Sequence, residues 1–255
     1  MIVTDELFRE DTTHSYWEKK TNRRVVGVTE LLHHVGYLSS DFMNSAALRR
    51  GRNVHTALHY YAKGTLDEKS LSPRIRPYFD SAMEFMVATK AKVKLSEVFV
   101  YDETVRLAAQ LDAVMEVFGG LAVIDYKSGP VSDWVRFQTA SHVNGLADGK
   151  TYRRFGLQLM EDGSQAILTE FKDNRDLLKV RMFASMFYTL VNDGVIDWPQ
   201  TWDGLEKKRS EDYGLELFTA NGGAGSSDPG VLRDGQAKTG TDQIIYPDKT
   251  AAIGS

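Results

Sequence analysis

The sequence predicts an α/β fold in which helices flank a central mixed or antiparallel β-sheet. Three consecutive runs rich in β-branched and aromatic residues, at 95–101, 106–118 and 121–126, have the composition of neighbouring strands. Segments whose apolar residues recur at helical spacing precede and follow these runs, as expected of helices that cover a sheet.

Turn and capping residues divide the rest of the chain into hairpins and helices. Before the three strands we expect a hairpin of 14–18 with 25–28, a helix from Thr29 to Gly36, a helix at 42–50 capped by Ser40 or Asp41, a helix at 51–64 that ends at Gly64, and a helix at 75–90 introduced by Pro73 and Pro77. After them we expect a helix at 134–149 capped by Ser132 or Asp133, a hairpin of 152–160 with 165–171, and a helix at 175–194 capped by Asn174.

A change of composition near Phe218 divides the chain into a domain and a tail. The chain has 255 residues, 42% of them hydrophobic, which is enough to build a substantial core. Residues 219–255 are rich in Gly, Ser, Thr and Asp and have too few large apolar side chains to offset the entropy of ordering. We therefore expect one domain at 1–218 and a flexible tail at 219–255, in which only the apolar segment 244–247 could dock on the domain or on a partner.

The composition excludes several kinds of site. The chain has no cysteine, so disulfides, thiolate zinc sites and iron–sulfur clusters are excluded, and oxygen and imidazole ligands point to Mg²⁺ or Mn²⁺. The net charge of −4 argues against a protein that coats nucleic acid, but not against an enzyme that acts on it. No run approaches the roughly 20 apolar residues of a membrane span. The acidic start is unlike a signal peptide, so we expect a cytoplasmic protein with no membrane partner.

The segment 112–127 is the most informative part of the sequence. The glycine pair at 119–120 favours a two-residue hairpin turn, which would place Asp112 opposite Lys127. Because side chains alternate across a strand, Asp125 would share their face, roughly 7–8 Å from Asp112 and within reach of one shared cation. An ordinary surface ion pair, worth about 0–1 kcal/mol, is the alternative. The apolar second strand favours burial, where such groups are costly unless they bind something.

Two further residues could join this site. If residues 102–105 form the loop between the first two strands, Glu97 shares the face of the aspartates, although a one-residue slip would turn it away. His55 and His59 have the spacing of half a zinc site on a helix, but Thr56 replaces the glutamate that the zinc-peptidase pattern requires. For either histidine, the alternative is a half-buried helix residue that is hydrogen-bonded to a neighbour.

Six segments between His14 and about Leu190 form an ordered set. They are the opening hairpin and helix HSYWEKKTNRRVVGVTELL, a Gly-x-x-x-His helix with His55, the strand SEVFVY with Glu97, AAQLDAVME with Asp112, VIDYKSG with Asp125 and Lys127, and WVRFQTASHVNG with Gln138. Taken together in this order, they resemble the PD-(D/E)XK nuclease superfamily, specifically its RecB-type exonuclease branch found in phage and repair proteins. The resemblance implies a restriction-endonuclease-like core. His142 stands where the family usually has tyrosine, and the four-cysteine cluster of some relatives is absent.

The resemblance also implies a function, that of a metal-dependent DNA exonuclease used in recombination or repair. It implies Mg²⁺ or Mn²⁺ held by His55, Asp112, Asp125 and the Tyr126 carbonyl, catalysis by Asp112, Asp125, Lys127 and Glu97, and DNA contacts from Arg52, Arg136, Gln138 and His142. Expected partners are DNA, a recombination or single-strand-annealing protein, and further copies of the chain.

Two other functions stay open on the sequence alone. A non-catalytic module that binds nucleic acid or a partner on the same fold would have no use for buried acids that repel phosphate. A sequence-specific restriction endonuclease would need a recognition domain, which we do not find in this length.

Overall fold

The computed structural model describes residues 6–10, 15–38 and 45–201. Its strands are β1 (Leu7–Glu10), β2 (Ser15–Glu18), β3 (Arg24–Gly27), β4 (Lys92–Asp102), β5 (Leu107–Val117), β6 (Gly120–Lys127), β7 (Tyr152–Gln158) and β8 (Ile167–Glu170). Its helices are α1 (Val28–His34), α2 (Ser45–Ala62), α3 (Arg76–Thr89), α4 (Val135–Leu146) and α5 (Arg175–Asn192), with a short 3₁₀ helix, η2 (Glu68–Ser70). The predicted tail at 219–255 and the predicted caps Ser40 and Asp41 lie outside the described residues.

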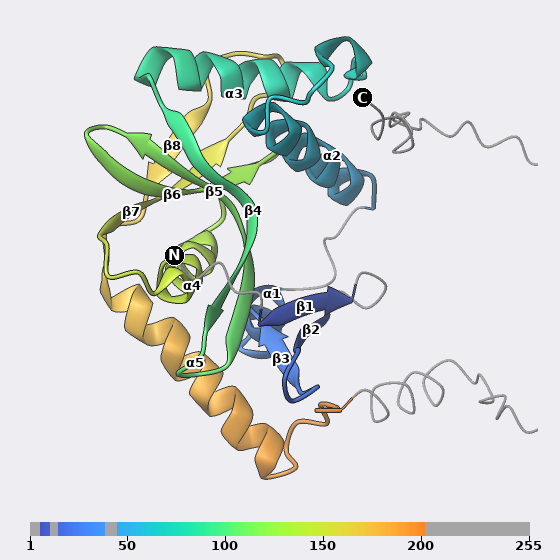
Figure 1. Cartoon of the computed structure of the whole chain (residues 1–255), viewed down its shortest axis with the longest axis vertical. Coiled ribbons are helices and arrows are strands. Elements are labelled where there is room, and N and C mark those ends of the chain that lie inside the picture. Colours follow the sequence, from blue (N-terminus) through green and yellow to red (C-terminus); the bar gives the residue numbers. More distant parts are fainter. Residues whose placement is uncertain (1–5, 11–14, 39–44, 202–255) are drawn as a thin grey trace, which may run out of the picture.

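Within these ranges, all the strands belong to one mixed sheet (Figure 1). β5 is its central strand: β4 pairs antiparallel with it along one side, while β3 and β6 share the other side. The β3–β5 and β6–β7 pairs are parallel and the remaining pairs are antiparallel. β6 and β7 are joined through α4, the crossover that a parallel pair requires. The predicted α/β class, with a mixed sheet flanked by helices, is confirmed.

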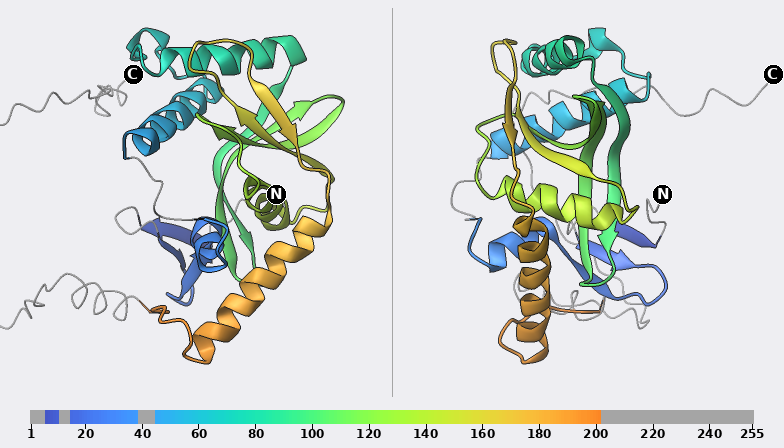
Figure 2. Two further views of the ribbon diagram at one scale, coloured as in Figure 1. Left: turned by 180° about the vertical axis from the view of Figure 1, so that it is seen from behind. Right: turned by 90° about the vertical axis from the view of Figure 1, so that its left-hand side faces the viewer.

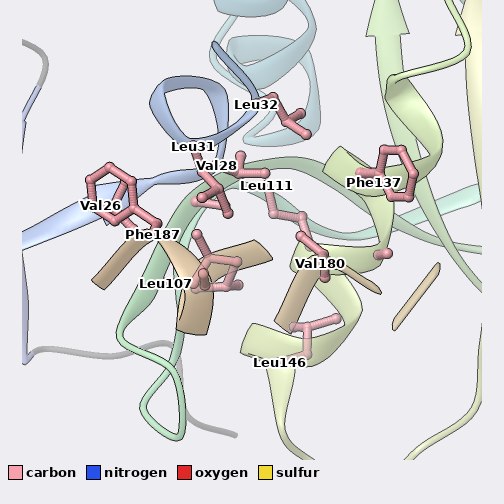
Figure 3. Packing of buried hydrophobic residues seen from close by; sticks show 14 of the residues in the cluster. Val26, Val28, Leu31, Leu32, Leu107, Leu111, Phe137, Leu146, Val180 and Phe187 are labelled. Atoms are coloured by element: carbon pink, nitrogen blue, oxygen red, sulfur yellow. The ribbon is translucent and has the colours of Figure 1, made fainter. Parts of the chain in front are cut away.

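Helices bury both faces of the sheet. One core is built from α1, α4 and α5 against β3 and β5, and Figure 3 shows its side chains, including Leu111 and Phe187, meeting between these elements. The other core is built from α2 and α3, which lie together away from α5 (Figures 1 and 2). Successive side chains of a strand point to opposite faces of the sheet, so Val123 of β6 packs in the first core and Ile124 packs in the second. β6 is therefore buried on both sides, as its apolar composition predicted.

The β5–β6 turn lies one residue earlier than the predicted one. Phe118 and Gly119 both have positive φ, 52° and 75°, and β6 begins at Gly120. A primed two-residue turn requires positive φ at both central positions, so the turn is Phe118-Gly119 and the predicted Gly119-Gly120 turn is wrong. Val114 consequently pairs with Val123. The register has moved by two residues, so every side chain keeps its predicted face.

The β4–β5 register differs in the same way. Asp102 pairs with Leu107, so the loop between the strands is 103–106. The predicted loop, 102–105, begins and ends one residue earlier. The shift is again two residues, so the residues of β4 keep their predicted faces relative to β5. Glu97 itself has φ of 51°, in the left-handed region, and interrupts the ladder between Ser96 and Val98. Such a conformation costs on the order of 1–3 kcal/mol and is found disproportionately at functional sites.

Two further differences concern the N-terminal half. The helices predicted at 42–50 and 51–64 are, in the described part, the single helix α2. Gly51, at the predicted boundary, lowers the stability of the helix by only about 1 kcal/mol. The burial of Val54 and Leu58 on the same helix stabilises it by more than that. Strand β1 was not predicted. It pairs with β2 as an edge strand, and its sequence LFRE lacks a turn signal that would mark it.

Close packing of α4 on β4 gives a stability prediction. A Cβ at Gly145 would lie 2.9 Å from both the Tyr101 nitrogen and Val100 Cβ, so part of the contact is with backbone that cannot rotate away. We expect Gly145→Ala to lower the free energy of unfolding by about 1–2 kcal/mol, because overpacking outweighs the gain in helix propensity. Urea unfolding would measure the loss. Gly120→Ala is the control, since a Cβ there meets nothing within 4 Å. Equal stability of the two variants would contradict the packing argument.

Candidate metal centre

A polar cluster forms where α2 approaches the middle of the sheet. Its groups come from four elements: the imidazole of His55 on α2, the carboxylates of Glu97 on β4 and Asp112 on β5, and the main chain of Tyr126 on β6. One ligand atom from each of the three side chains lies within 4.8 Å of the others. The structure therefore brings together four of the residues that the sequence indicated.

The hydrogen bonds of this cluster fix its orientation. His55 Nε2 lies 3.0 Å from the Tyr126 carbonyl oxygen, and because a carbonyl only accepts, Nε2 must donate. Nδ1 then faces the carboxylates, 3.3 Å from Asp112 Oδ1 and 3.5 Å from Glu97 Oε1. Asp112 Oδ2 accepts a 2.8 Å hydrogen bond from the Tyr126 backbone N–H. Histidine ligands of metals are usually oriented in this way, through a backbone carbonyl on the second nitrogen.

The electrostatics of the cluster favour a positive charge at its centre. Burial opposes the charge on His55, but Asp112 and Glu97 outweigh it and raise the pKa of His55 to about 10. Burial also opposes the charge on Asp112, yet His55 and Lys127 lower the pKa of Asp112 to about 2. In the metal-free protein a proton on Nδ1 thus supplies a positive charge between the buried carboxylate of Asp112 and the half-buried one of Glu97.

The same groups fit a divalent cation. Glu97 Oε1 is buried and has no hydrogen-bond partner among the described residues, which leaves a carboxylate oxygen available beside the other donors. Asp112 Oδ1 and His55 Nδ1 lie close to this oxygen. A cation bound between them would replace the present contact of Asp112 Oδ1 with His55 Nδ1. A set of carboxylate oxygens with one imidazole suits Mg²⁺ or Mn²⁺ better than softer metals.

A second group of residues lies beside this cluster. Asp125 is completely buried, and burial, together with the charge of Asp112, raises the pKa of Asp125 to about 6 against the opposing effect of Lys127. Lys127 Nζ lies 2.5 Å from Asp125 Oδ2 and donates to Gln138 Oε1 at 3.2 Å. It also lies 5.0 Å from the centre of the Trp134 ring. The ammonium is therefore held in place by α4 and its preceding loop, next to the candidate metal ligands.

The remaining predicted DNA-contact residues have different surroundings. Arg52 is exposed on α2. Arg136 forms a 2.7 Å ion pair with the buried carboxylate of Asp176 on α5, which holds α4 against α5. His142 is fully buried, and neither ring nitrogen makes a well-formed hydrogen bond within the described residues. Burial lowers the pKa of His142 to about 4. A ring with no exposed surface does not fit the predicted DNA contact, so that assignment is corrected.

Sequence reasoning missed three residues near the centre. Gln110 Nε2 donates to Glu97 Oε2 at 2.6 Å, and Arg9 Nη1 donates to Gln110 Oε1 at 2.9 Å. Arg50 donates to the Ser128 carbonyl at 3.3 Å. Gln110 could have been found, since it lies two residues before Asp112 on the same strand. Arg9 gave no signal, because β1 was not recognised as a strand.

The raised pKa of His55 predicts the pH dependence of metal binding. Coordination through Nδ1 requires its proton to leave, so cation and proton compete. With a pKa of about 10 for His55 in the metal-free protein, the apparent Mg²⁺ affinity should rise by about tenfold per pH unit between pH 7 and 9. Calorimetric titrations in two buffers of different ionisation enthalpy would count the released proton. A pH-independent affinity would contradict coordination by Nδ1.

The same pKa fixes the sign of a stability effect in the metal-free protein. The folded-state pKa of His55 lies above its ordinary 6.5, so the stabilisation is fully present below about pH 6.5 and is lost as the pH rises through 10.

Comparison with solved structures gives distant likenesses. The crystal structure of an alkaline exonuclease, LHK-Exo, from Laribacter hongkongensis has a TM-score of 0.38 and 14% sequence identity, covering 73% of this chain and 94% of that one. The structure of LHK-Exo in complex with dAMP has a TM-score of 0.35 and 13% identity, with the same coverage. No protein-family model matches the sequence, and no curated protein gives a significant match. The TM-scores are too low to assign an activity, so this chain's own residues must indicate its function. In the described ranges, no helix has both the length and the apolar character needed to cross a membrane.

Proposed function

We propose that this chain is a metal-dependent nuclease that hydrolyses phosphodiester bonds in DNA. The observation that supports the proposal is the placing of the Lys127 ammonium next to the cluster of His55, Glu97 and Asp112, at the buried end of β6. Phosphodiester hydrolysis needs a cation that neutralises the phosphate and a group that stabilises the charge developing in the transition state. Both requirements can be met within this small region.

Each residue has a role that follows from its position. His55, Glu97 and Asp112 would hold Mg²⁺ or Mn²⁺, with Asp125 as a further ligand. The Tyr126 carbonyl, predicted from the sequence as a ligand, accepts from His55 Nε2 and would instead orient the imidazole. Such a cation would lower the pKa of its bound water and polarise a phosphate oxygen.

Lys127 would donate to the oxygen on which negative charge accumulates. Its contact with Gln138 directs Nζ, since the amide oxygen accepts and so keeps one N–H of the ammonium in a fixed direction. Asp125 holds the ammonium in an ion pair. Gln138, Arg52 and Arg136 are the proposed contacts to the DNA backbone, and Arg136 would have to share its guanidinium with Asp176 to make one.

We further propose that the enzyme is an exonuclease of recombination or repair, of phage or prophage type and RecB-like, that acts in the cytoplasm. A recombination or single-strand-annealing protein and further copies of the chain are the proposed partners. All described site residues lie before residue 143, and we propose that the catalytic domain ends near residue 218.

The decisive experiment compares two DNA substrates. End-labelled linear DNA and a covalently closed circle are incubated with the full chain and Mg²⁺, with a chelator as the control. We expect loss of the linear DNA only, and only with Mg²⁺. Cleavage of the circle would replace the exonuclease with an endonuclease. DNA binding without cleavage of either substrate would overturn the proposal in favour of a non-catalytic binding module.

A further inference from the structure

A chain of hydrogen bonds leads from the N-terminal strand to the candidate metal centre. Arg9 on β1 donates from Nη1 to Gln110 Oε1 at 2.9 Å, and Gln110 on β5 donates from Nε2 to Glu97 Oε2 at 2.6 Å. The other oxygen of the Glu97 carboxylate, Oε1, faces His55 Nδ1 at 3.5 Å. Three side chains, from three different strands, thus end at the cluster that would hold the cation.

The chemistry of these groups gives the chain a fixed direction. A guanidinium can only donate hydrogen bonds, so Arg9 requires the carbonyl oxygen of the Gln110 amide to point toward it. The amide NH₂ must then point toward Glu97, which accepts as a carboxylate. Without Arg9, the amide of Gln110 could rotate and present its oxygen to Glu97, which would repel the carboxylate.

Glu97 needs such support because its backbone is unfavourable. Its φ of 51° lies in the left-handed region inside a β-strand. A residue in this conformation persists only when its surroundings hold it there. Only Oε2 accepts a hydrogen bond within the described residues, while Oε1 is buried without one. The bond from Gln110 is therefore what fixes the direction of the free oxygen.

We propose that Arg9 and Gln110 are positioning residues that direct Glu97 Oε1 at the divalent cation. The inference rests on the proposed function, in that it assumes a cation in this cluster. It adds that an edge strand, β1, outside the segments that resemble the nuclease family, is part of the metal centre. Groups that orient a metal ligand are typically worth about 10–100-fold in metal affinity.

The test is a Mn²⁺ titration of the full chain by calorimetry, without DNA. We expect Arg9→Met to weaken Mn²⁺ binding by about 10–100-fold, and Arg9→Lys, which keeps a donor, to recover most of the affinity. Arg153→Met is the matched control, since Arg153 pairs with Glu170 at 2.7 Å, outside the candidate centre. Its affinity should equal that of the parent.

A double variant separates positioning from a general effect on the fold. Gln110→Leu removes the donor to Glu97, so Arg9→Met should weaken binding little further in that background, because Arg9 acts through Gln110. Full additivity of the two changes would overturn the proposal and assign Arg9 to the β1–β2 hairpin alone. Unchanged affinity of Arg9→Met would also overturn it and leave the metal site intact. A parent protein that binds no Mn²⁺ would overturn both this inference and the proposed function.

Discussion

Replacing Asp112 with asparagine should weaken Mg²⁺ or Mn²⁺ binding by more than about 100-fold, the upper end of the loss seen when only an orienting partner is removed. Cleavage of linear DNA should fall below detection. His55 and Lys127 lower the pKa of Asp112 to about 2 against the effect of burial, so this carboxylate carries full charge at neutral pH. Its Oδ1 faces His55 Nδ1 at 3.3 Å, where a cation would replace the proton. Asparagine removes that charge without changing the size of the side chain.

The fold should survive this substitution. Asp112 Oδ2 accepts from the Tyr126 N–H, and an amide oxygen can accept the same bond. Asp80→Asn is the matched control, because Asp80 is an exposed acid that pairs with Arg76 on α3. Circular dichroism would verify folding, and calorimetry would measure metal affinity. Parental metal affinity in Asp112→Asn would remove Asp112 from the ligand set and end the case for this centre.

The sequence predicted which side chains share a face of the sheet more reliably than it predicted which residues pair across the strands. Both registers around β5 were wrong by two residues, yet Glu97 and Asp112 still meet, because an even shift leaves every side chain on its face. A Gly-Gly pair does not reveal which residue begins the turn, and Phe118 accepts positive φ there. The alternation of polar and apolar residues is thus the more robust signal, since burial enforces it.

The supporting residues could not be predicted in the same way. Gln110 and Arg9 act through long-range contacts between strands, and no local spacing connects β1 with β5. The burial of His142 depends on the packing of α4 against the sheet, which the helical periodicity alone does not fix. The DNA contacts of Arg52, Arg136 and Gln138 stay predictions. The residues that hold the candidate site rigid come from tertiary packing, whereas its candidate carboxylate ligands were visible in the strand patterns.

Lys127→Met should lower the cleavage rate by about 10²–10³-fold, the cost of deleting one group that stabilises developing charge. Methionine keeps an apolar side chain of similar length but removes the ammonium, which lies 5.0 Å from the centre of the Trp134 ring. Metal affinity should change much less than in Asp112→Asn, because Lys127 donates hydrogen bonds and cannot coordinate a cation. Binding of DNA in Ca²⁺ should likewise stay within a few-fold of the parent.

The loss of Lys127 also leaves Asp125 without its counter-charge. Burial already raises the pKa of Asp125 to about 6, so removal of the ammonium should raise it further and favour a protonated carboxyl. The cleavage rate of Lys127→Met should therefore recover in part as the pH rises above 7, because Asp125 then loses its proton. Lys172→Met, at an exposed lysine beside Glu170, is the control for charge alone. If the variant's loss of DNA affinity accounts for its whole rate loss, Lys127 only holds phosphate, and the transition-state role proposed for it is wrong.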